Sequence, residues 1–364
     1  LIIIVGLILI ASQLMKEYGQ LERMVNSFIP LTKDFRIISA VMPSLIGLLP
    51  MPGGALFSAP MVETALQENN VAKELKTAIN YWFRHVWEYW WPLYPGPVLA
   101  MGLLGVATWH FIAVQFLFSV AAILGGSFFL LRPIRKIRKD QHIQISWEKI
   151  KIFLWEIMPI IVVILVIVIF TLMTGFLKIF GFSFKAPAAL TILLGLTASI
   201  VWVAVINRIP FRKVIYASFK RNIPPMLFLI ISIMIFKEIL KDSNAVFQIR
   251  HELSAHHIPV LAIIIVMPFI SGLMTGIAIG FVGVTFPLII PLFNSSSSLD
   301  CLAYGSLAYA FGYMGMILSP VHLCLLVSKD YFKAPLTSVY AFIIKPVIFV
   351  FITAIVIFVS LRAF

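Results

Sequence analysis

The sequence predicts an all-α polytopic membrane protein built from two inverted-topology repeats. Its 364 residues are 61% hydrophobic and only 12% charged, and its mean hydropathy is +1.03. Soluble domains typically carry about twice that charged fraction, so the composition excludes an ordinary water-soluble fold. Apolar runs of about 20 residues, long enough to cross a bilayer, recur along the chain. Short motifs of the first half also recur in the same order in the second half, which indicates an internal duplication.

Proline and glycine interrupt two apolar stretches of the first half. A first helix is expected over residues 1–15, and residues 37–62 carry Pro-Met-Pro-Gly-Gly at their centre. That centre favours a re-entrant hairpin over one straight span. The next helix is expected to run from about residue 72 to Trp91 and to stop at residues 92–97, which contain three prolines. Since proline cannot continue a helix, residues 72–104 are predicted to form a broken helix.

The second half contains the same kinds of element. A second hairpin is predicted over residues 260–292, where glycines and Thr275 interrupt the apolar run. A second broken helix is expected over residues 299–327, interrupted at Ser319-Pro320, and a last helix ends near residue 361. Continuous spans are expected at residues 109–131, 152–177, 186–206 and 223–240.

The basic residues indicate how the chain is oriented in the membrane. The chain has 28 Lys and Arg against 15 Asp and Glu, a net charge of +13. Residues 132–151 hold seven Lys or Arg and residues 208–221 hold five, so the positive-inside rule places both loops in the cytoplasm. This placement favours a multi-pass protein of the inner (plasma) membrane and argues against a nucleic-acid partner.

The two cysteines predict no metal site. Cys301 and Cys324 lie in or beside apolar spans and form neither a disulfide framework nor a zinc-binding pattern. No cofactor is expected, and Na⁺ enters only as a candidate coupling ion.

The repeat rests on an ordered series of matches. The offset between matching residues grows smoothly from 221 to 225, 227 and 228 along the chain. The matched residues are Leu14-Met15-Lys16-Glu17 with Ile235-Phe236-Lys237-Glu238, Val41-Met42-Pro43 and Gly47 with Val266-Met267-Pro268 and Gly272, Pro60 with Pro287, and Phe83 and Pro92 with Phe311 and Pro320.

The count of membrane crossings gives the two halves opposite orientations. Residues 1–131 are predicted to form the first repeat, residues 132–151 a basic cytoplasmic loop, and residues 152–364 the second repeat. The second repeat has two extra leading helices, so the first is expected to be truncated at its N-terminus. Secondary transporters are typically built this way, with the binding site at the midplane, where hairpin tips meet unwound helices.

Four segments resemble an uncharacterised prokaryotic membrane-protein family of the ion transporter superfamily. They are MPSLIGLLPMPGGALFSAP, MPFISGLMTGIAIGFVGVTFPLIIP, FRHVWEYWWPLYPG and GYMGMILSPVHLCLLVSKDYF. Relatives of this family include gluconate permeases, dicarboxylate and citrate carriers, and arsenite pumps. The resemblance implies a scaffold plus a transport domain, a homodimer and an elevator-type motion. Sodium-coupled dicarboxylate relatives carry Ser-Asn-Thr at their hairpin tips, and neither hairpin here has it.

The hairpin tips and breaks supply the candidate binding residues. Half-helix N-termini present free N–H groups that suit an anion, and glycine lets the backbone approach a ligand closely. Helix packing at the glycines and bonding of each hydroxyl to its own helix are the competing interpretations. The predicted substrate-binding residues are Gly53, Gly54, Ser58, Arg84, Tyr94, Ser271, Thr275, Gly276, Ser319 and His322, of which Tyr94 and His322 follow Pro92 and Pro320 at the two breaks.

Glu88 is the most informative charge, because it is expected about 18 Å along its helix from the cytoplasmic edge. An acid at that depth typically faces a cavity, a partner or a proton path. His85 lies in the same turn, and an ordinary histidine side chain titrates near neutral pH, so His85 and Glu88 are the predicted proton-coupling residues. An internal Arg84–Glu88 pair, or an interfacial belt formed by the surrounding tryptophans, are the structural alternatives.

The predicted function is secondary active transport of a small organic anion, a carboxylate or sugar acid, coupled to H⁺ or Na⁺. A cation/proton antiporter on the same scaffold, a channel and a membrane-embedded enzyme are the alternatives. Enzymatic activity is not expected, because Glu88 is the only acid deep in a predicted span and no paired acids are available.

Overall fold

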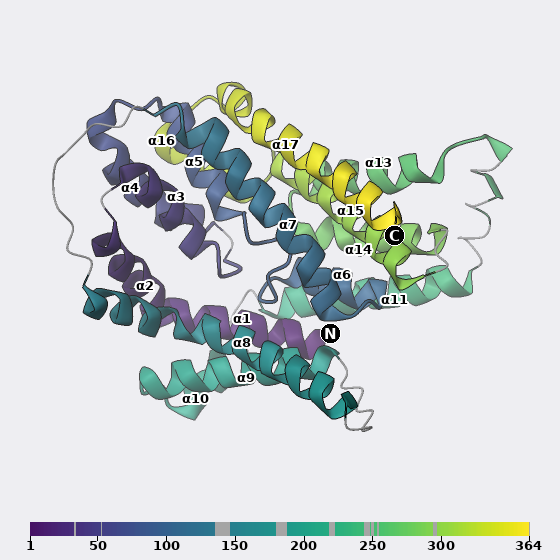
Figure 1. The fold of residues 1–364 in the computed structure, drawn as a ribbon, viewed down its shortest axis with the longest axis horizontal. Coiled ribbons are helices and arrows are strands. Elements are labelled where there is room, and N and C mark those ends of the chain that lie inside the picture. Colours follow the sequence, from purple (N-terminus) through teal and green to yellow (C-terminus); the bar gives the residue numbers. More distant parts are fainter. Residues whose placement is uncertain are drawn as a thin grey trace. The chain divides into compact units, whose positions relative to one another are not determined.

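The computed structural model describes residues 1–32, 34–51, 53–134, 146–179, 188–217, 223–243, 248, 251–252, 255–293 and 297–363 (Figure 1). In this part of the chain the secondary structure is helical, with no strand. The chain divides into two compact units. Unit 1 comprises Leu1–Lys33, Leu48–Pro50 and Asp140–Leu229, and unit 2 comprises Asp34–Gly47, Met51–Lys139 and Ile230–Phe364.

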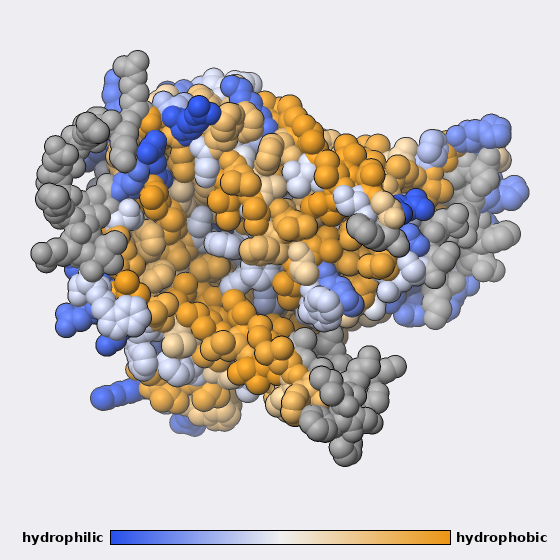
Figure 2. Space-filling view, viewed as in Figure 1, coloured by the Kyte–Doolittle hydropathy of each residue, from blue (hydrophilic) through white to orange (hydrophobic). Residues whose placement is uncertain are grey.

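Several helices have the length and composition of membrane spans. Among the described residues, four pass this test: Thr108–Leu131, Trp147–Thr174, Ile223–Leu240 and Leu336–Ala363. A fifth would be the bent pair Ile2–Glu17 and Gln20–Leu31, whose axes differ by 69°. Apolar side chains cover much of the face in Figure 2. On the span at Thr108–Leu131, for example, Phe116, Leu124 and Phe128 are exposed while Gln115 and Ser119 are buried, as expected for a helix with one side toward lipid. The prediction of a helical chain is therefore confirmed for the described residues, and four or five of their helices could cross a membrane.

Unit 1 is a layer of helices in which α1 (Ile2–Glu17) packs on α9 (Ala188–Ile206), and α9 packs on α8 (Trp147–Ile179). The short helices α2 (Gln20–Phe28) and α10 (Phe211–Ala217) complete the layer. Helix α11 (Ile223–Asp242) begins in unit 1, and its residues from Ile230 onward belong to unit 2. A polar network connects α2 to α8 and to the residue after α9. Arg23 Nε lies 3.1 Å from Glu156 Oε2, Arg23 Nη2 donates to Asn207 Oδ1 at 2.7 Å, and Asn207 Nδ2 donates to Gln20 Oε1 at 3.1 Å.

Unit 2 contains two helix pairs, two broken helices and two long helices. The pairs are α3 (Phe35–Ile46) with α4 (Ala55–Leu66), and α13 (Val260–Thr275) with α14 (Ala278–Ile289). The broken helices are α5 (Lys73–Arg84) with α6 (Pro95–Leu104), and α15 (Ser298–Ile317) with α16 (Leu323–Phe332). The long helices are α7 (Thr108–Gly126, continued by a π-helical turn over Ser127–Leu131) and α17 (Leu336–Ala363). Interruptions therefore occur in each segment where the sequence predicted a hairpin or a broken helix.

Local sequence explains several of these ends. Gly53 has φ +69° and turns the chain into α4, and Gly276 has φ +62° and ends α13, a backbone region that favours glycine. Pro95 occupies the first turn of α6, where its missing N–H costs nothing. The Ser297 side chain accepts from the Asp300 N–H at 3.1 Å and caps α15.

The first broken helix differs from the prediction, because α5 ends at Arg84 rather than continuing to Trp91. Two tyrosines that are distant in sequence donate hydrogen bonds to the segment that follows Arg84. Tyr313 Oη donates to the His85 carbonyl at 2.6 Å, and Tyr309 Oη donates to the Glu88 carbonyl at 2.9 Å. These bonds satisfy carbonyl groups of residues 85–91, which form turns. His85 and Glu88 therefore lie on an unwound segment and not on a continuous helix.

Equivalent positions of the two halves make equivalent contacts in unit 2. A Cβ on Gly47 would lie 2.0 Å from the Arg84 carbonyl oxygen, and a Cβ on Gly272 would lie 2.0 Å from that of Gly312. At the second break, Tyr81 Oη donates to the Ile317 carbonyl at 2.9 Å. At the first break, Tyr309 Oη donates to the Glu88 carbonyl in a similar way. The matched glycines and tyrosines agree with the alignment of the halves, while opposite membrane orientation and re-entrant hairpins stay predictions.

The predicted division of the chain into residues 1–131, 132–151 and 152–364 also stays a prediction. The basic loop at residues 132–151 lies largely outside the described residues, as do parts of the loop at residues 208–221.

Candidate functional site

The candidate site lies inside unit 2, where the first helix pair meets both breaks. Met51 and Gly54 come from the α3–α4 connection, Arg84 ends α5, and His322 is the residue before α16. Arg84, His85, Glu88 and His322 are all buried, with exposed fractions of 2%, 3%, 7% and 6%. Burial of four ionisable side chains in an apolar unit is costly, so these groups need partners.

Arg84 holds the tip of the first helix pair. Its Nη2 donates to the Met51 carbonyl at 2.8 Å, and its Nη1 contacts the Ile46 carbonyl at 3.4 Å and the Tyr94 hydroxyl at 3.2 Å. A Cβ on Gly54 would lie 2.6 Å from Arg84 Nη2, so only glycine leaves room for the guanidinium. The structure thus brings four predicted residues together, namely Gly53, Gly54, Arg84 and Tyr94.

His85 and His322 form a direct pair, with their Nε2 atoms 3.1 Å apart. His85 Nδ1 lies 2.6 Å from the Tyr81 carbonyl, which can only accept, so this nitrogen carries a proton. In the neutral pair, His85 Nε2 is therefore the acceptor and His322 Nε2–H the donor. Glu88 Oε1 lies 3.9 Å from His85 Nε2, so three titratable groups follow one another in space.

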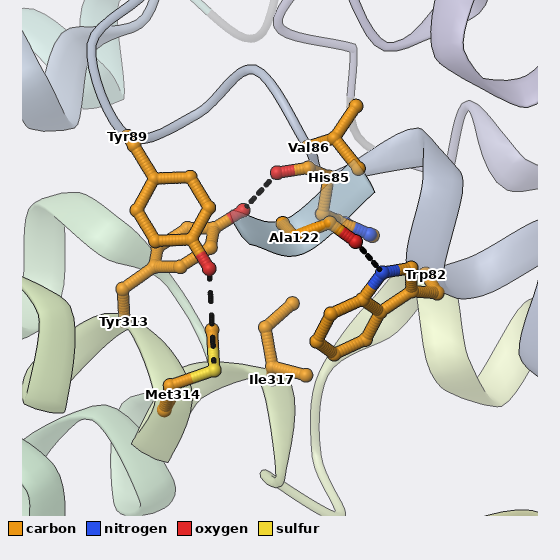
Figure 3. A pocket seen from close by; sticks show the side chains of 8 residues that line it. All are labelled: Trp82, His85, Val86, Tyr89, Ala122, Tyr313, Met314 and Ile317. Carbon is orange, nitrogen blue, oxygen red and sulfur yellow. Dashed lines mark hydrogen bonds between the residues drawn. The ribbon is translucent and has the colours of Figure 1, made fainter. Parts of the chain in front are cut away.

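A small cavity adjoins His85 (Figure 3). Its volume is about 10 Å³, close to the minimum for one water molecule. Tyr89, Tyr313 and Met314 line it, and the Tyr89 hydroxyl donates to Met314 Sδ at 4.0 Å. Both ring nitrogens of His85 already have partners, so the cavity adds no further polar group to the site.

Three polar residues of the site were missed by the sequence analysis. Asn80 Nδ2 donates to the Ala55 carbonyl at 3.0 Å and to Ser328 Oγ at 2.9 Å, and Ser58 Oγ donates to Asn80 Oδ1 at 2.5 Å. Cys324 lies close to both histidines. Their positions beside the predicted helix breaks could have indicated these residues, because Asn80 precedes Arg84 by one turn, and Ser328 and Cys324 follow the second break.

The second helix pair contributes less to the polar cluster. Gly276 contacts the second break, since a Cβ there would lie 3.0 Å from Ser319 Oγ and 3.1 Å from the His322 nitrogen. Thr275 is exposed and donates to the Ser271 carbonyl of its own helix at 2.8 Å. For Thr275 the competing interpretation, bonding within the helix, fits the structure better.

The tryptophans near Glu88 pack inside unit 2. Trp82 and Trp91 are 3% and 4% exposed. The Nε1 of Trp82 donates to the Ala122 carbonyl at 2.8 Å, and that of Trp87 donates to the Ser44 carbonyl at 2.9 Å. An interfacial aromatic belt would leave such rings at the surface, so that alternative does not describe these side chains.

Fold and site together define the class: in its described residues, a helical protein with apolar helices that could span a membrane and with interrupted helices around a buried polar cluster. The chain belongs to the family of proteins of unknown function DUF401, whose family model matches residues 1–362. No curated protein matches the chain.

Proposed function

We propose that the protein is a secondary active transporter of a small organic anion, a carboxylate or sugar acid, coupled to protons. The observation that carries this proposal is the buried cluster of Arg84, His85, Glu88 and His322 at the helix interruptions of unit 2. The cluster combines a permanent positive charge with three titratable groups, and all four side chains are buried.

The anion preference follows from Arg84. Arginine stays protonated and presents a planar fork of donors that matches a carboxylate. The N-termini of α4, α6 and α16 follow the interruptions, and helix N-termini favour negative charge. A substrate carboxylate would be bound by Arg84 between the two breaks, with Tyr94 and His322 beside it.

The proton preference follows from the chain of Glu88, His85 and His322. The Nε2 atoms of His85 and His322 lie 3.1 Å apart, which suits direct proton exchange. Glu88 Oε1 lies 3.9 Å from the same His85 Nε2, so a proton would pass between these two groups through one water molecule or after a small movement. Sodium would instead need several oxygen ligands around one ion, and of Glu88, His85 and His322 only Glu88 supplies oxygen atoms.

The two compact units suit a scaffold and a transport domain, with unit 2 as the transport domain. The matched contacts at Gly47 and Gly272 support a structural repeat, and we propose that the repeat is inverted and that its helix pairs are re-entrant hairpins. We extend the proposal to the features that the resemblance to the ion transporter superfamily implies: a homodimer in the plasma membrane and an elevator-type motion.

Solid-supported-membrane electrophysiology on proteoliposomes tests this function. We expect a panel of carboxylates and sugar acids to give at least one substrate-dependent current that grows with an inward proton gradient. Glu88→Gln keeps the size of the side chain but cannot ionise, so it should abolish the proton dependence.

Other results would favour other functions. A current that needs Na⁺ and is unchanged in Glu88→Gln would contradict proton coupling. Responses to pH or Na⁺ jumps alone, with no substrate current, would indicate the cation/proton antiporter instead.

A further inference from the structure

A second chemistry is available at the same place, because Cys324 lies beside the histidine pair. One nitrogen of His85, one nitrogen of His322 and the Cys324 sulfur all lie within 4.8 Å of one another. All three residues are buried, and Cys324 is 6% exposed. The proposed transport function makes no use of this thiol.

The two imidazoles are arranged as metal ligands are. Two nitrogens bound to one tetrahedral ion at about 2.0 Å would be about 3.3 Å apart, and the two Nε2 atoms lie 3.1 Å apart. Metal-binding histidines usually donate their second N–H to a carbonyl or carboxylate. His85 does so, because its Nδ1 faces the Tyr81 carbonyl at 2.6 Å.

The ligand types and the local charge decide which ion fits. One thiolate with two imidazoles is a soft set of three ligands, which suits Cu(I) or Zn(II). The Arg84 guanidinium acts electrostatically on His85, His322 and Cys324. The Glu88 carboxylate acts on Cys324 as well and offsets the Arg84 charge. The Cys324 thiolate then neutralises a monovalent ion, whereas a divalent ion keeps one uncompensated positive charge.

We propose that His85, His322 and Cys324 bind a soft monovalent metal ion of the Cu⁺ and Ag⁺ class inside unit 2. The bound ion joins the unwound segment after α5 to the start of α16. This site does not depend on the transported substrate, so it stands or falls separately from the transport proposal.

Silver is the probe, because Ag⁺ does not change oxidation state under the conditions used. The full chain is purified in detergent and chloride-free buffer as Cys301→Ser, which leaves Cys324 as the only thiol. Native mass spectrometry is expected to show one bound Ag⁺ per chain. Adding Cys324→Ser or His322→Gln should weaken binding by about 100-fold, the upper end of what even an outer-shell partner contributes to a metal site.

Two further measurements identify the ligand atoms and show that each variant is folded. X-ray absorption at the silver edge should show sulfur and nitrogen ligands together, and near-native thermal unfolding of each variant without metal shows that it is folded. Equal Ag⁺ affinity in the presence and absence of Cys324, or an affinity unchanged by His322→Gln, would overturn the site. Tighter binding of Zn²⁺ than of Cu⁺ would overturn the assignment to a monovalent ion.

Discussion

Replacement of Arg84 with alanine is expected to abolish substrate-driven current and to destabilise unit 2. The guanidinium bonds the Met51 carbonyl at 2.8 Å and the Tyr94 hydroxyl at 3.2 Å, and both partners are buried. Each hydrogen bond to a charged group contributes about 1.5–3 kcal/mol, and a buried acceptor left unpaired costs about 1–3 kcal/mol. Loss of the anion contact alone should therefore lower apparent substrate affinity by about 10-fold to 100-fold.

The informative variant is Arg84→Lys, which keeps the charge. Lysine presents a single ammonium in place of a planar fork, so it cannot satisfy Met51 and Tyr94 and also bind a carboxylate in the same geometry. We expect Arg84→Lys to fold but to transport poorly, as measured by electrophysiology and thermal unfolding. Arg23→Lys in unit 1, where the Arg23 side chain is 42% exposed, is the matched control and should remain active. Wild-type currents in Arg84→Lys would exclude Arg84 as the anion-binding residue.

Alanine at Gly47 or at Gly272 is expected to destabilise the protein strongly and to a similar extent. Each new Cβ would lie 2.0 Å from a backbone carbonyl oxygen, that of Arg84 or of Gly312. Backbone atoms cannot move aside as a flexible side chain can, so the cost should reach about 3 kcal/mol or more, the upper range for overpacking. The measurements are purified yield and the midpoint of thermal unfolding in detergent.

Gly6→Ala provides the control for these two variants. Its Cβ would meet only Leu227 Cδ2 at 3.8 Å, an ordinary contact. Alanine should even favour helix α1 by about 1 kcal/mol. If only one of Gly47→Ala and Gly272→Ala were destabilising, the two glycines would not be structurally equivalent and the repeat would lose its main structural support.

Much of the fold could be predicted because proline and glycine act locally. They interrupt α3–α4, α5–α6, α13–α14 and α15–α16 within the predicted segments, since these residues limit helix continuity whatever surrounds them. The end of α5 at Arg84 could not be predicted in this way. It depends on hydrogen bonds from Tyr309 and Tyr313, more than 200 residues away in sequence.

Only part of the candidate site could be predicted, because the sequence reveals charged residues in apolar segments more readily than small polar ones. Arg84, His85, Glu88 and His322 stood out because charge is rare in apolar segments. Asn80, Ser328 and Cys324 did not stand out, since small polar residues in membrane helices usually bond to their own helix. Only the packing of α5 against α4 and α16 shows that Asn80 joins three segments.

Protection of Cys324 tests the central claim most directly, because this native thiol lies beside the proposed anion site. The measurement is the rate at which methyl methanethiosulfonate labels Cys301→Ser protein in proteoliposomes, followed by intact mass. The account predicts that an anion giving a transport current slows labelling of Cys324, and that this protection disappears in Arg84→Lys. A transported anion that leaves the labelling rate unchanged would contradict a binding site at Arg84 and the helix breaks.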